Sequence, residues 1–288
     1  MSGIKQFDRQ YRFAAGRAKG VGFEIGETSA EYPTALRISF TVDKTDAETP
    51  NTAQISLWNL NQEHLSMLNE PDCVVTLRAG YGKHMALIFV GVITYIETSL
   101  DKGDKETRLE AVDGGIELRD SFVSLSYAGV ISTKKIIEDV ATEMGVALTF
   151  SYNAQFSDLA NGFTCVGQAR VALDKACAES GLQWQLSNGV LLVKKKNDVM
   201  SREVYELTPE SGLIGLPKKI TYGKDASNEG EQSGYEVEYF MNGAIGMGDF
   251  IRLESRVTQG YFRIRSIQLI GDNIDGDWMC IAKLIEAS

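Results

Sequence analysis

Hydrophobic and polar residues alternate along most of the chain, and this period of two predicts strands with one buried face. The alternation is clearest from Asn51 to Gly82. There a strand over Thr52 to Trp58 leads into a short helical segment, Gln62 to Leu68, and then into a second strand that ends in an aromatic glycine turn. The stretch contains a change of local structure and no recognisable chemistry.

Two regions of the chain carry this β pattern. The first extends from Gly20 to Ala111, and turns divide it into about six strands. One of them, the run from Leu87 to Thr98, has Gly91 at the place where a bulge is expected to bend it. The second region follows Lys196 and also divides into about six strands. Each region is therefore long enough for a small antiparallel barrel.

The middle of the chain, from Gly129 to Lys196, follows a helical period instead. Apolar residues recur at spacings of three and four in two stretches, each of which ends at a glycine and is followed by a short β segment. The first helix is expected to begin after Ser132, which can cap it, and to end at Gly145. The second is expected to end at Gly181. The middle is thus predicted to be a compact α/β insertion.

These patterns predict an α+β fold, mostly β, in which two small antiparallel β-barrels flank the insertion. The expected ranges are 1–19 for an N-terminal arm, 20–128 for the first barrel, 129–200 for the α/β insertion and 201–288 for the second barrel. The arm has weak periodicity and an excess of basic residues. It is expected either to order on a neighbouring subunit or to fray.

Charge and cysteine usage narrow the class of protein. The 288 residues carry a formal charge of −10, which argues against a protein that grips phosphate backbones, because that affinity needs clustered Lys and Arg. The four cysteines are far apart, form no CxxC pair and lie beside no histidine, so buried free thiols are favoured over disulfides or a structural zinc site. We expect a reducing compartment. No apolar run approaches a bilayer-spanning length, so we expect no membrane insertion and assembly in the cytoplasm.

Candidate catalytic residues do not converge. His64 and His84 belong to no nucleophile motif and are expected at the surface. Four acids follow one another closely, and a solvated face is favoured over a glycosidase pair. They are Glu110, Asp113, Glu117 and Asp120. We therefore expect no enzyme, with no catalytic residues, no cofactor-binding residues and no metal ligands.

Three further patterns receive structural interpretations. Gly80 to Lys83 lacks the upstream glycine of a phosphate loop. Gly243 to Gly248 lies in a region predicted to form strands, and no helix is predicted after it. Neither segment therefore predicts nucleotide binding. Lys194 to Lys196 is expected to be a solvated strand edge. Five aromatic residues are expected in the core or in interfaces. They are Tyr95, Tyr222, Tyr239, Phe262 and Trp278.

Asn51 to Gly82 resembles the N-terminal barrel of phage baseplate hub proteins, the Mu-like hubs and the late control protein D family. Those proteins carry an N-A-x-I-x-I-x-N-L strand, a short helix and a V-x-L-x-A-G-Y strand. The segments Ser211 to Pro217, Tyr261 to Ile264 and Gly271 to Trp278 are similar to other parts of the same family. One departure is Asn242 to Gly248, which lacks the two prolines of the family's N-P-x-I-x-P-G turn.

The resemblance implies a structural protein of the contractile tail, located in the virion baseplate. It implies a homotrimer in which three chains present six tube-like barrels and so join a sixfold tail tube to a threefold central spike. The implied partners are further copies of the chain, the spike, the tail tube or tube initiator protein and other baseplate proteins. DNA is expected to pass through the lumen during genome ejection without specific binding, because acidic residues on the inner strands repel it.

Two alternatives are a sixfold tail tube initiator or ring component, and a tail module that binds peptidoglycan. For a ring protein the functional residues are interface residues. We expect them at barrel edges and in long loops, above all Asp43 to Pro50, Leu100 to Lys105 and Gly223 to Gly234.

Overall fold

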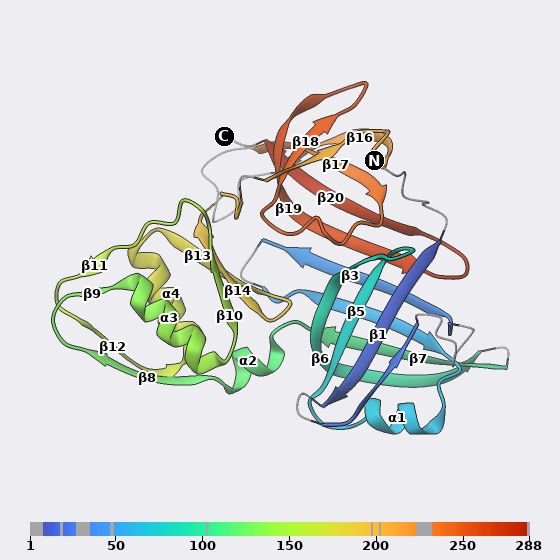
Figure 1. Cartoon of the computed structure of the whole chain (residues 1–288), viewed down its shortest axis with the longest axis horizontal. Coiled ribbons are helices and arrows are strands. Elements are labelled where there is room, and N and C mark those ends of the chain that lie inside the picture. The colour runs from blue at the N-terminus through green and yellow to red at the C-terminus, as the bar shows by residue number, and fades with distance from the viewer. Residues whose placement is uncertain are drawn as a thin grey trace.

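The computed structural model describes residues 8–17, 20–26, 35–46, 49–101, 103–196, 198–201, 203–222 and 232–286. Among these residues one 13-stranded sheet contains strands from both ends of the chain, and a smaller α/β unit stands beside it (Figure 1). The expected α+β, mostly β fold with an α/β insertion is confirmed.

The first half of the sheet comes from the N-terminal part of the chain. Its strands are β1 (Arg9–Arg17), β2 (Gly22–Ile25), β3 (Ile38–Thr45), β4 (Thr52–Trp58), β5 (Cys73–Tyr81), β6 (His84–Asp101) and β7 (Asp104–Val112). The expected short helix, α1 (Gln62–Leu68), is present and buries Leu65 and Leu68 against the sheet. It begins after Asn61, whose side chain accepts a hydrogen bond from the His64 backbone N–H at 2.7 Å.

The second half of the sheet comes from the C-terminal part. Its strands are β15 (Val204–Leu207), β16 (Leu213–Tyr222), β17 (Gln232–Phe240), β18 (Phe250–Glu254), β19 (Gln259–Asp272) and β20 (Trp278–Glu286). The two halves are not separate closed barrels, because β19 pairs with β3 through seven residue pairs, from Ser266 opposite Thr45 to Asp272 opposite Ser39. β18 pairs with β19 only as far as Arg263, so on this edge the C-terminal part of β19 is free to pair with β3 of the first half.

The two halves repeat one strand order. Hydrogen-bonded neighbours run β3-β4-β7-β6-β5-β1 in the first half and β16-β17-β20-β19-β18-β15 in the second. The long hairpins correspond as well, since β6–β7 has a register shift between Ile93 and Tyr95, and β19–β20 has one between Ile264 and Ser266. The difference is that β1 is antiparallel to β5 whereas β15 is parallel to β18. The chain thus contains one strand arrangement twice.

The insertion has its own hydrophobic core. Its elements are β8 (Phe122–Tyr127), β9 (Ile131–Ser132), α3 (Thr133–Met144), β10 (Ala147–Phe150), β11 (Asp158–Leu159), β12 (Phe163–Gln168), α4 (Ala169–Glu179), β13 (Leu182–Ser187) and β14 (Val190–Lys195), and α2 (Gly115–Asp120) leads into it. Both expected helices are confirmed. Ser132 caps α3, and Gly145 ends it with a φ of 69°, which glycine adopts without strain. β8 packs in this core through Val123 and Leu125, although its residues fall within the range 20–128 expected for the first barrel.

Two details differ from the sequence-based expectations. Residues 1–7, 18 and 19 of the expected arm lie outside the described residues, but Arg9–Arg17 is a strand, paired with β5 along its whole length. The reason is its alternation, because Tyr11, Phe13 and Ala15 enter the core while Arg12 and Ala14 lie on the opposite face. Gly91 forms no bulge, and its backbone instead lies so close to Val112 that a Cβ would be 2.6 Å from the Val112 carbonyl oxygen.

The four cysteines, Cys73, Cys165, Cys177 and Cys280, are free and buried, as expected. Among the described residues, no helix is both long enough and apolar enough to span a bilayer.

Candidate assembly interface

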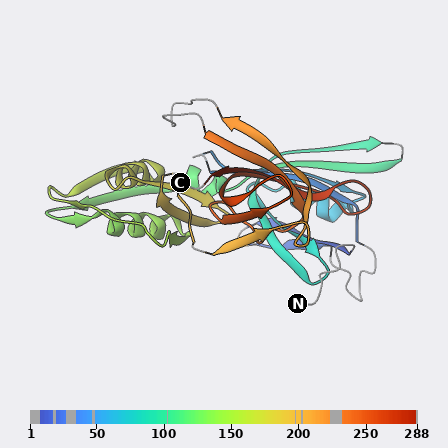
Figure 2. The ribbon, with the colours of Figure 1, turned by 90° about the horizontal axis from the view of Figure 1, so that it is seen from above.

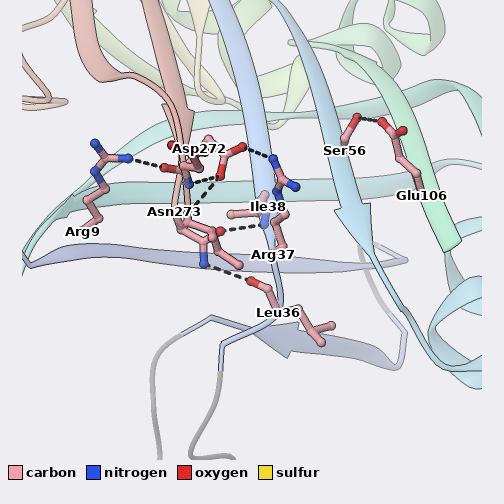
Figure 3. A network of polar contacts seen from close by, with 10 residues as sticks. Arg9, Leu36, Arg37, Ile38, Ser56, Glu106, Asp272 and Asn273 are labelled. Carbon is pink, nitrogen blue, oxygen red and sulfur yellow. Dashed lines mark hydrogen bonds and ion pairs between the residues drawn. The ribbon is translucent and has the colours of Figure 1, made fainter. Parts of the chain in front are cut away.

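Polar residues at the end of β19 join the two halves of the sheet (Figure 3). The Asp272 carboxylate accepts a hydrogen bond from Arg37 at 2.8 Å, and its backbone carbonyl accepts one from Arg9 at 2.7 Å. Asn273 accepts from the Ile38 backbone N–H at 2.9 Å and donates to the Leu36 carbonyl at 3.1 Å. Arg37 and these loop residues thus fix the approach to β3 against the second half, and the Arg37 contact helps hold the pKa of Asp272 below its usual range although burial opposes this.

Apolar contacts accompany this polar network. Gly271 lies flat against the Phe40 ring, since an added Cβ would be 2.3 Å from the nearest ring carbon. The Trp278 indole donates to the Gly80 carbonyl at 3.1 Å, and the Tyr81 hydroxyl donates to the Trp278 carbonyl at the same distance. The motif from Gly271 to Trp278 therefore connects the second half of the sheet to the first.

The insertion docks on the sheet through the turn between β13 and β14. The Asn188 backbone N–H donates to the Asp113 carboxylate at 2.7 Å, and the Asn188 side chain accepts from the Val90 backbone N–H at 3.1 Å. The Asn51 amide also donates to Asp113, at 3.1 Å. Leu186 packs against Gly114 so closely that any Cβ at Gly114 would collide with it. This turn therefore fixes the insertion to the first half of the sheet.

Charged side chains are buried where the two halves and the insertion meet. Lys44 on β3 is 8% exposed, and burial lowers its pKa to about 8 although Asp113 opposes the shift. Burial also raises the pKa of Asp113. Arg263 on β19 forms an ion pair with Asp46 at 2.6 Å, beneath the surface. Each of these charges lies near an opposite charge from a distant segment of the chain. Replacing one member of such a pair by a neutral residue is therefore expected to destabilise the fold.

The outer face of the central strands is polar and mostly uncharged or acidic. Ser39 and Thr41 on β3 face outward beside Gln54 on β4, and a shallow groove of about 410 Å³ opens there. Further along, on β6 and β7, acids outnumber bases on the same face. Its acids are Glu97, Glu106 and Glu110 and its base is Arg108. This face offers no clustered cations for binding a phosphate backbone.

Two hairpins project from the body of the molecule in different directions (Figure 2). The first is β6–β7, and β5 accompanies β6 only as far as Val92. The second is β16–β17, and β16 is the last strand at its end of the sheet. In the described part of the chain, two strand edges have no neighbouring strand: the edge of residues 93–101 of β6 that faces away from β7, and the edge of β16 that faces away from β17. The backbone groups of these edges are open to another chain.

The three loops expected at interfaces have different outcomes. Of Leu100 to Lys105, the described residues lie at the tip of the β6–β7 hairpin, where Leu100 is 74% exposed, and residue 102 lies outside the described residues. In Asp43 to Pro50, the residues Asp43, Lys44 and Thr45 belong to β3, which continues to pair with β19 there, and residues 47 and 48 lie outside the described residues. Of Gly223 to Gly234, residues 223–231 lie outside the described residues and the last three belong to β17.

Several single residues are placed differently from the expectations. His64 is partly buried and stacks on Phe23 with ring centroids 4.0 Å apart, whereas His84 is exposed at the start of β6 as expected. Asp113 is buried rather than part of a solvated face, because the insertion covers it. Lys194 is buried at 4% exposure and donates to the Asp198 carbonyl, so Lys194 to Lys196 is not simply a solvated edge.

Of the five aromatic residues, Tyr239, Phe262 and Trp278 lie in the core, and Tyr95 is 48% exposed on β6. The Tyr222 side chain lies outside the described residues. Gly243 to Gly248 forms the connection between β17 and β18, the place that α1 occupies in the first half, and it buries Ile245 and Met247. The glycine-rich segment is thus a packed connection of the second half.

The residues that join the parts of the chain were largely missed from sequence. Arg9 and Arg37 carry no local pattern that shows their partner. The Ser187-Asn188-Gly189 turn is recognisable as a hairpin, but its docking on Asp113 is not, since the contact spans 75 positions. The strongest available signal was the motif from Gly271 to Trp278, whose residues prove to lie at the junction between the halves.

The fold is similar to those of several solved tail proteins. The 43 kDa tail protein of prophage MuSo2 from Shewanella oneidensis is 9% identical, with 97% of each chain covered and a TM-score of 0.63. The tail protein of Neisseria meningitidis MC58 is 14% identical, with 96% of each chain covered and a TM-score of 0.60. The c3393 protein of Escherichia coli, a component of the type VI secretion system, is 11% identical with a TM-score of 0.59, over 88% of this chain and 74% of that one.

At these identities the likeness shows a shared fold. Among curated protein sequences none matches the chain. Residues 20–259 match the family described as Baseplate hub gp41. The matched range spans the first β region from β2 onward, the whole insertion and β15 to β18 of the second half. The match covers most of the chain, and the chain therefore belongs to the baseplate hub gp41 family of phage tail structural proteins.

Proposed function

We propose that three copies of this hub form a closed ring of six similar β units, which joins the tail tube to the central spike of a contractile tail. The observation that carries the proposal is the strand order that occurs twice in one chain. A chain with two equivalent units reconciles sixfold and threefold neighbours, because three copies present six units on one side while remaining a trimer. The hub would assemble with its partners in the host cytoplasm.

The outer face of β3, β4, β6 and β7 suits the wall of the channel in such a ring. It is rich in Ser, Thr and Gln, and its acids outnumber its bases. Like charge keeps a polyanion from adhering, so DNA would slide past this face during ejection. A channel that proved electropositive in the assembled ring would contradict this assignment.

The hub's role would be architectural, without catalytic activity. Within the described residues no group of three or more His, Cys, Asp or Glu side chains is arranged to hold a metal ion. Two of the four acids weighed as a glycosidase pair have structural partners: Asp113 accepts a hydrogen bond from Asn188 of the insertion, and Asp120 forms an ion pair with Arg119. The partners would be the spike, the tube or tube initiator protein and adjacent baseplate proteins.

The test is the mass and shape of the assembled ring. The hub is co-expressed with the proteins encoded beside it in the tail gene cluster, and the complex is analysed by native mass spectrometry and electron cryomicroscopy. Three hub copies per ring with six β units around the channel are expected. Six copies would favour a sixfold tube initiator instead, and a hub that stays monomeric with all partners present would overturn the proposal.

A further inference from the structure

The internal repeat gives each strand of one half a counterpart in the other. Corresponding pairings match β3 with β16, β4 with β17, β7 with β20 and β6 with β19. Within the chain, β19 of the second half pairs with β3 of the first. The counterparts of these two strands are β6 and β16, and each of the two has an unpaired edge in the described part of the chain.

The open part of β6 corresponds to the part of β19 that pairs with β3. β5 leaves β6 after Val92, just before the register shift against β7. β18 leaves β19 after Arg263, just before the register shift against β20. Beyond the shift, residues 266–272 of β19 pair with β3, whereas residues 95–101 of β6 have only β7. The edge of β6 in the first half is thus open, whereas the corresponding edge of β19 in the second half is paired with β3.

We propose that residues 95–99 of β6 in one hub copy pair antiparallel with residues 218–222 of β16 in the next copy, and that this pairing closes the ring. The contact repeats between chains the junction that β19 and β3 form within a chain. It rests on the proposed function, because it supplies the contact between neighbouring copies of a ring. Each copy uses one β6 edge and one β16 edge, so the interface is heterologous and closes by rotation.

The known pairings fix the register of this contact. Glu110 on β7 faces Tyr95 and, across β4, lies in line with Gln54 and Thr41. Lys283 on β20 likewise faces Ser266, and lies in line with Glu236 and Lys218. Tyr95 therefore corresponds to Ser266, and Thr41 to Lys218.

Within the chain, Thr41 faces Ile270, four residues after Ser266. By correspondence, Lys218 faces Ser99 of the neighbouring copy, four residues after Tyr95. The adjacent pair, Val42 opposite Leu269, predicts in the same way that Lys219 faces Thr98. The register is therefore specified to the residue.

Charge and shape at the two edges agree with this register. Lys218 is exposed and already has acids on one side, with its Nζ 2.7 Å from Glu238 and 3.8 Å from Glu236. The proposed strand adds Glu97 on the other side, diagonal to Lys218 and on the same face of the sheet. Opposite charges on diagonal neighbours of adjacent strands attract, which favours this pair of edges.

The end of the contact is marked by Pro217, which has no backbone N–H to donate and is tolerated only at an edge or a bulge. Leu216 beside it is 58% exposed, and Leu100 on the β6 tip is 74% exposed. The proposed pairing brings these two apolar segments together at its end. At the corresponding place within the chain, Phe40 packs on Gly271.

A disulfide trap tests the register directly. The variant Ser99→Cys with Lys218→Cys is co-expressed with the same tail partners, and the purified ring is oxidised and run on a denaturing gel. Covalent trimers are expected, since the two positions face each other in neighbouring copies. The offset pair, Ser99→Cys with Thr221→Cys, lies three positions out of register and on the other face, and is expected to give only monomers. The four native thiols are buried, which keeps the background low.

A charge exchange provides a second measurement. Lys218→Glu is expected to weaken ring assembly about fivefold, the size of an exposed ion pair, and adding Glu97→Lys is expected to restore it. Circular dichroism melts of each variant check that the fold is intact. A trimeric ring that gives no Ser99–Lys218 crosslink, or whose charge reversal is not rescued, overturns the edge pairing and leaves the trimer standing. Absence of any trimer with partners present overturns both.

Discussion

At the scale of single residues, the junction between the halves depends on a few side chains that have no role in either half alone. Gly271 admits the Phe40 ring, Asp272 receives Arg37 and Arg9, and Trp278 reaches the Gly80 carbonyl. These residues come from a motif that the sequence displays plainly. The arginines that contact this motif, Arg9 and Arg37, could not be identified from the sequence, because the residues around an arginine do not show whether a distant partner lies beside it in the fold.

Gly271→Ala is expected to destabilise the protein by about 1–3 kcal/mol, because the added methyl group would overlap the Phe40 ring and either the ring or the strand must move. Thermal unfolding measures the change. Gly246→Ala is the matched control, since a Cβ there meets only the Asp249 carboxylate at an ordinary 3.6 Å. Equal melting temperatures for the two variants would contradict the close packing.

The buried Lys44 predicts a pH dependence of stability. Its pKa is about 8 in the folded chain against 10.5 ordinarily, so between these values the unfolded chain binds more protons and stability rises with pH. The free energy of unfolding of the wild type, relative to Lys44→Met, is therefore expected to increase from about pH 7 to about pH 9, by at most about 1 kcal/mol per pH unit. Urea unfolding at each pH measures it.

The groups that face Lys44 limit the range of this measurement. Asp113 favours its charged form, and Cys280 is the other neighbour. Burial raises the pKa of Cys280 to about 11, which lowers stability as pH rises past the ordinary thiol value of 9, so the comparison ends there. Parallel pH curves for the wild type and Lys44→Met would show that Lys44 keeps an ordinary pKa.

At the scale of elements, local patterns predicted most of the structure. α1, α3 and α4 follow from apolar spacing and capping residues, and the strands of both β regions follow from alternation. β1 was missed although Tyr11, Phe13 and Ala15 alternate, because the surrounding arginines gave the segment the composition of a terminal arm. The place of the insertion could not be predicted, since it depends on contacts of the β13–β14 hairpin with residues distant in sequence, among them Asn188 with Asp113 and Gln185 with Thr45.

Asn188→Gly is expected to loosen the contact between the β13–β14 turn and the sheet, while the sheet and the insertion each stay folded. Glycine keeps the positive φ of 52° that the turn requires but loses the hydrogen bond to the Val90 N–H, a loss of about 1 kcal/mol. Hydrogen exchange is expected to quicken at Val90 and in the turn, with α3 and α4 unchanged. Asn161→Gly, in an exposed turn of the insertion, is the control. Unchanged exchange at Val90 in Asn188→Gly would show that the turn does not hold the insertion.

At the scale of the whole molecule, the sequence predicted two β units and the structure joins them into one sheet. Strand alternation says which residues face a core but not which strands share an edge, so the pairing of β19 with β3 was beyond reach. The same limit applies to the candidate interface. The β6–β7 tip was predicted as an exposed hairpin, whereas the open edge behind it becomes visible only when the length of β5 is known.

The pairing of β19 with β3 also decides how the molecule bears mechanical load. Seven residue pairs connect the halves side by side along the strands, so a pull along the strand direction must break them together rather than one at a time. Along this direction the two halves therefore act as one mechanical unit. A displacement imposed on one half is thereby transmitted to the other with little lost in bending between them.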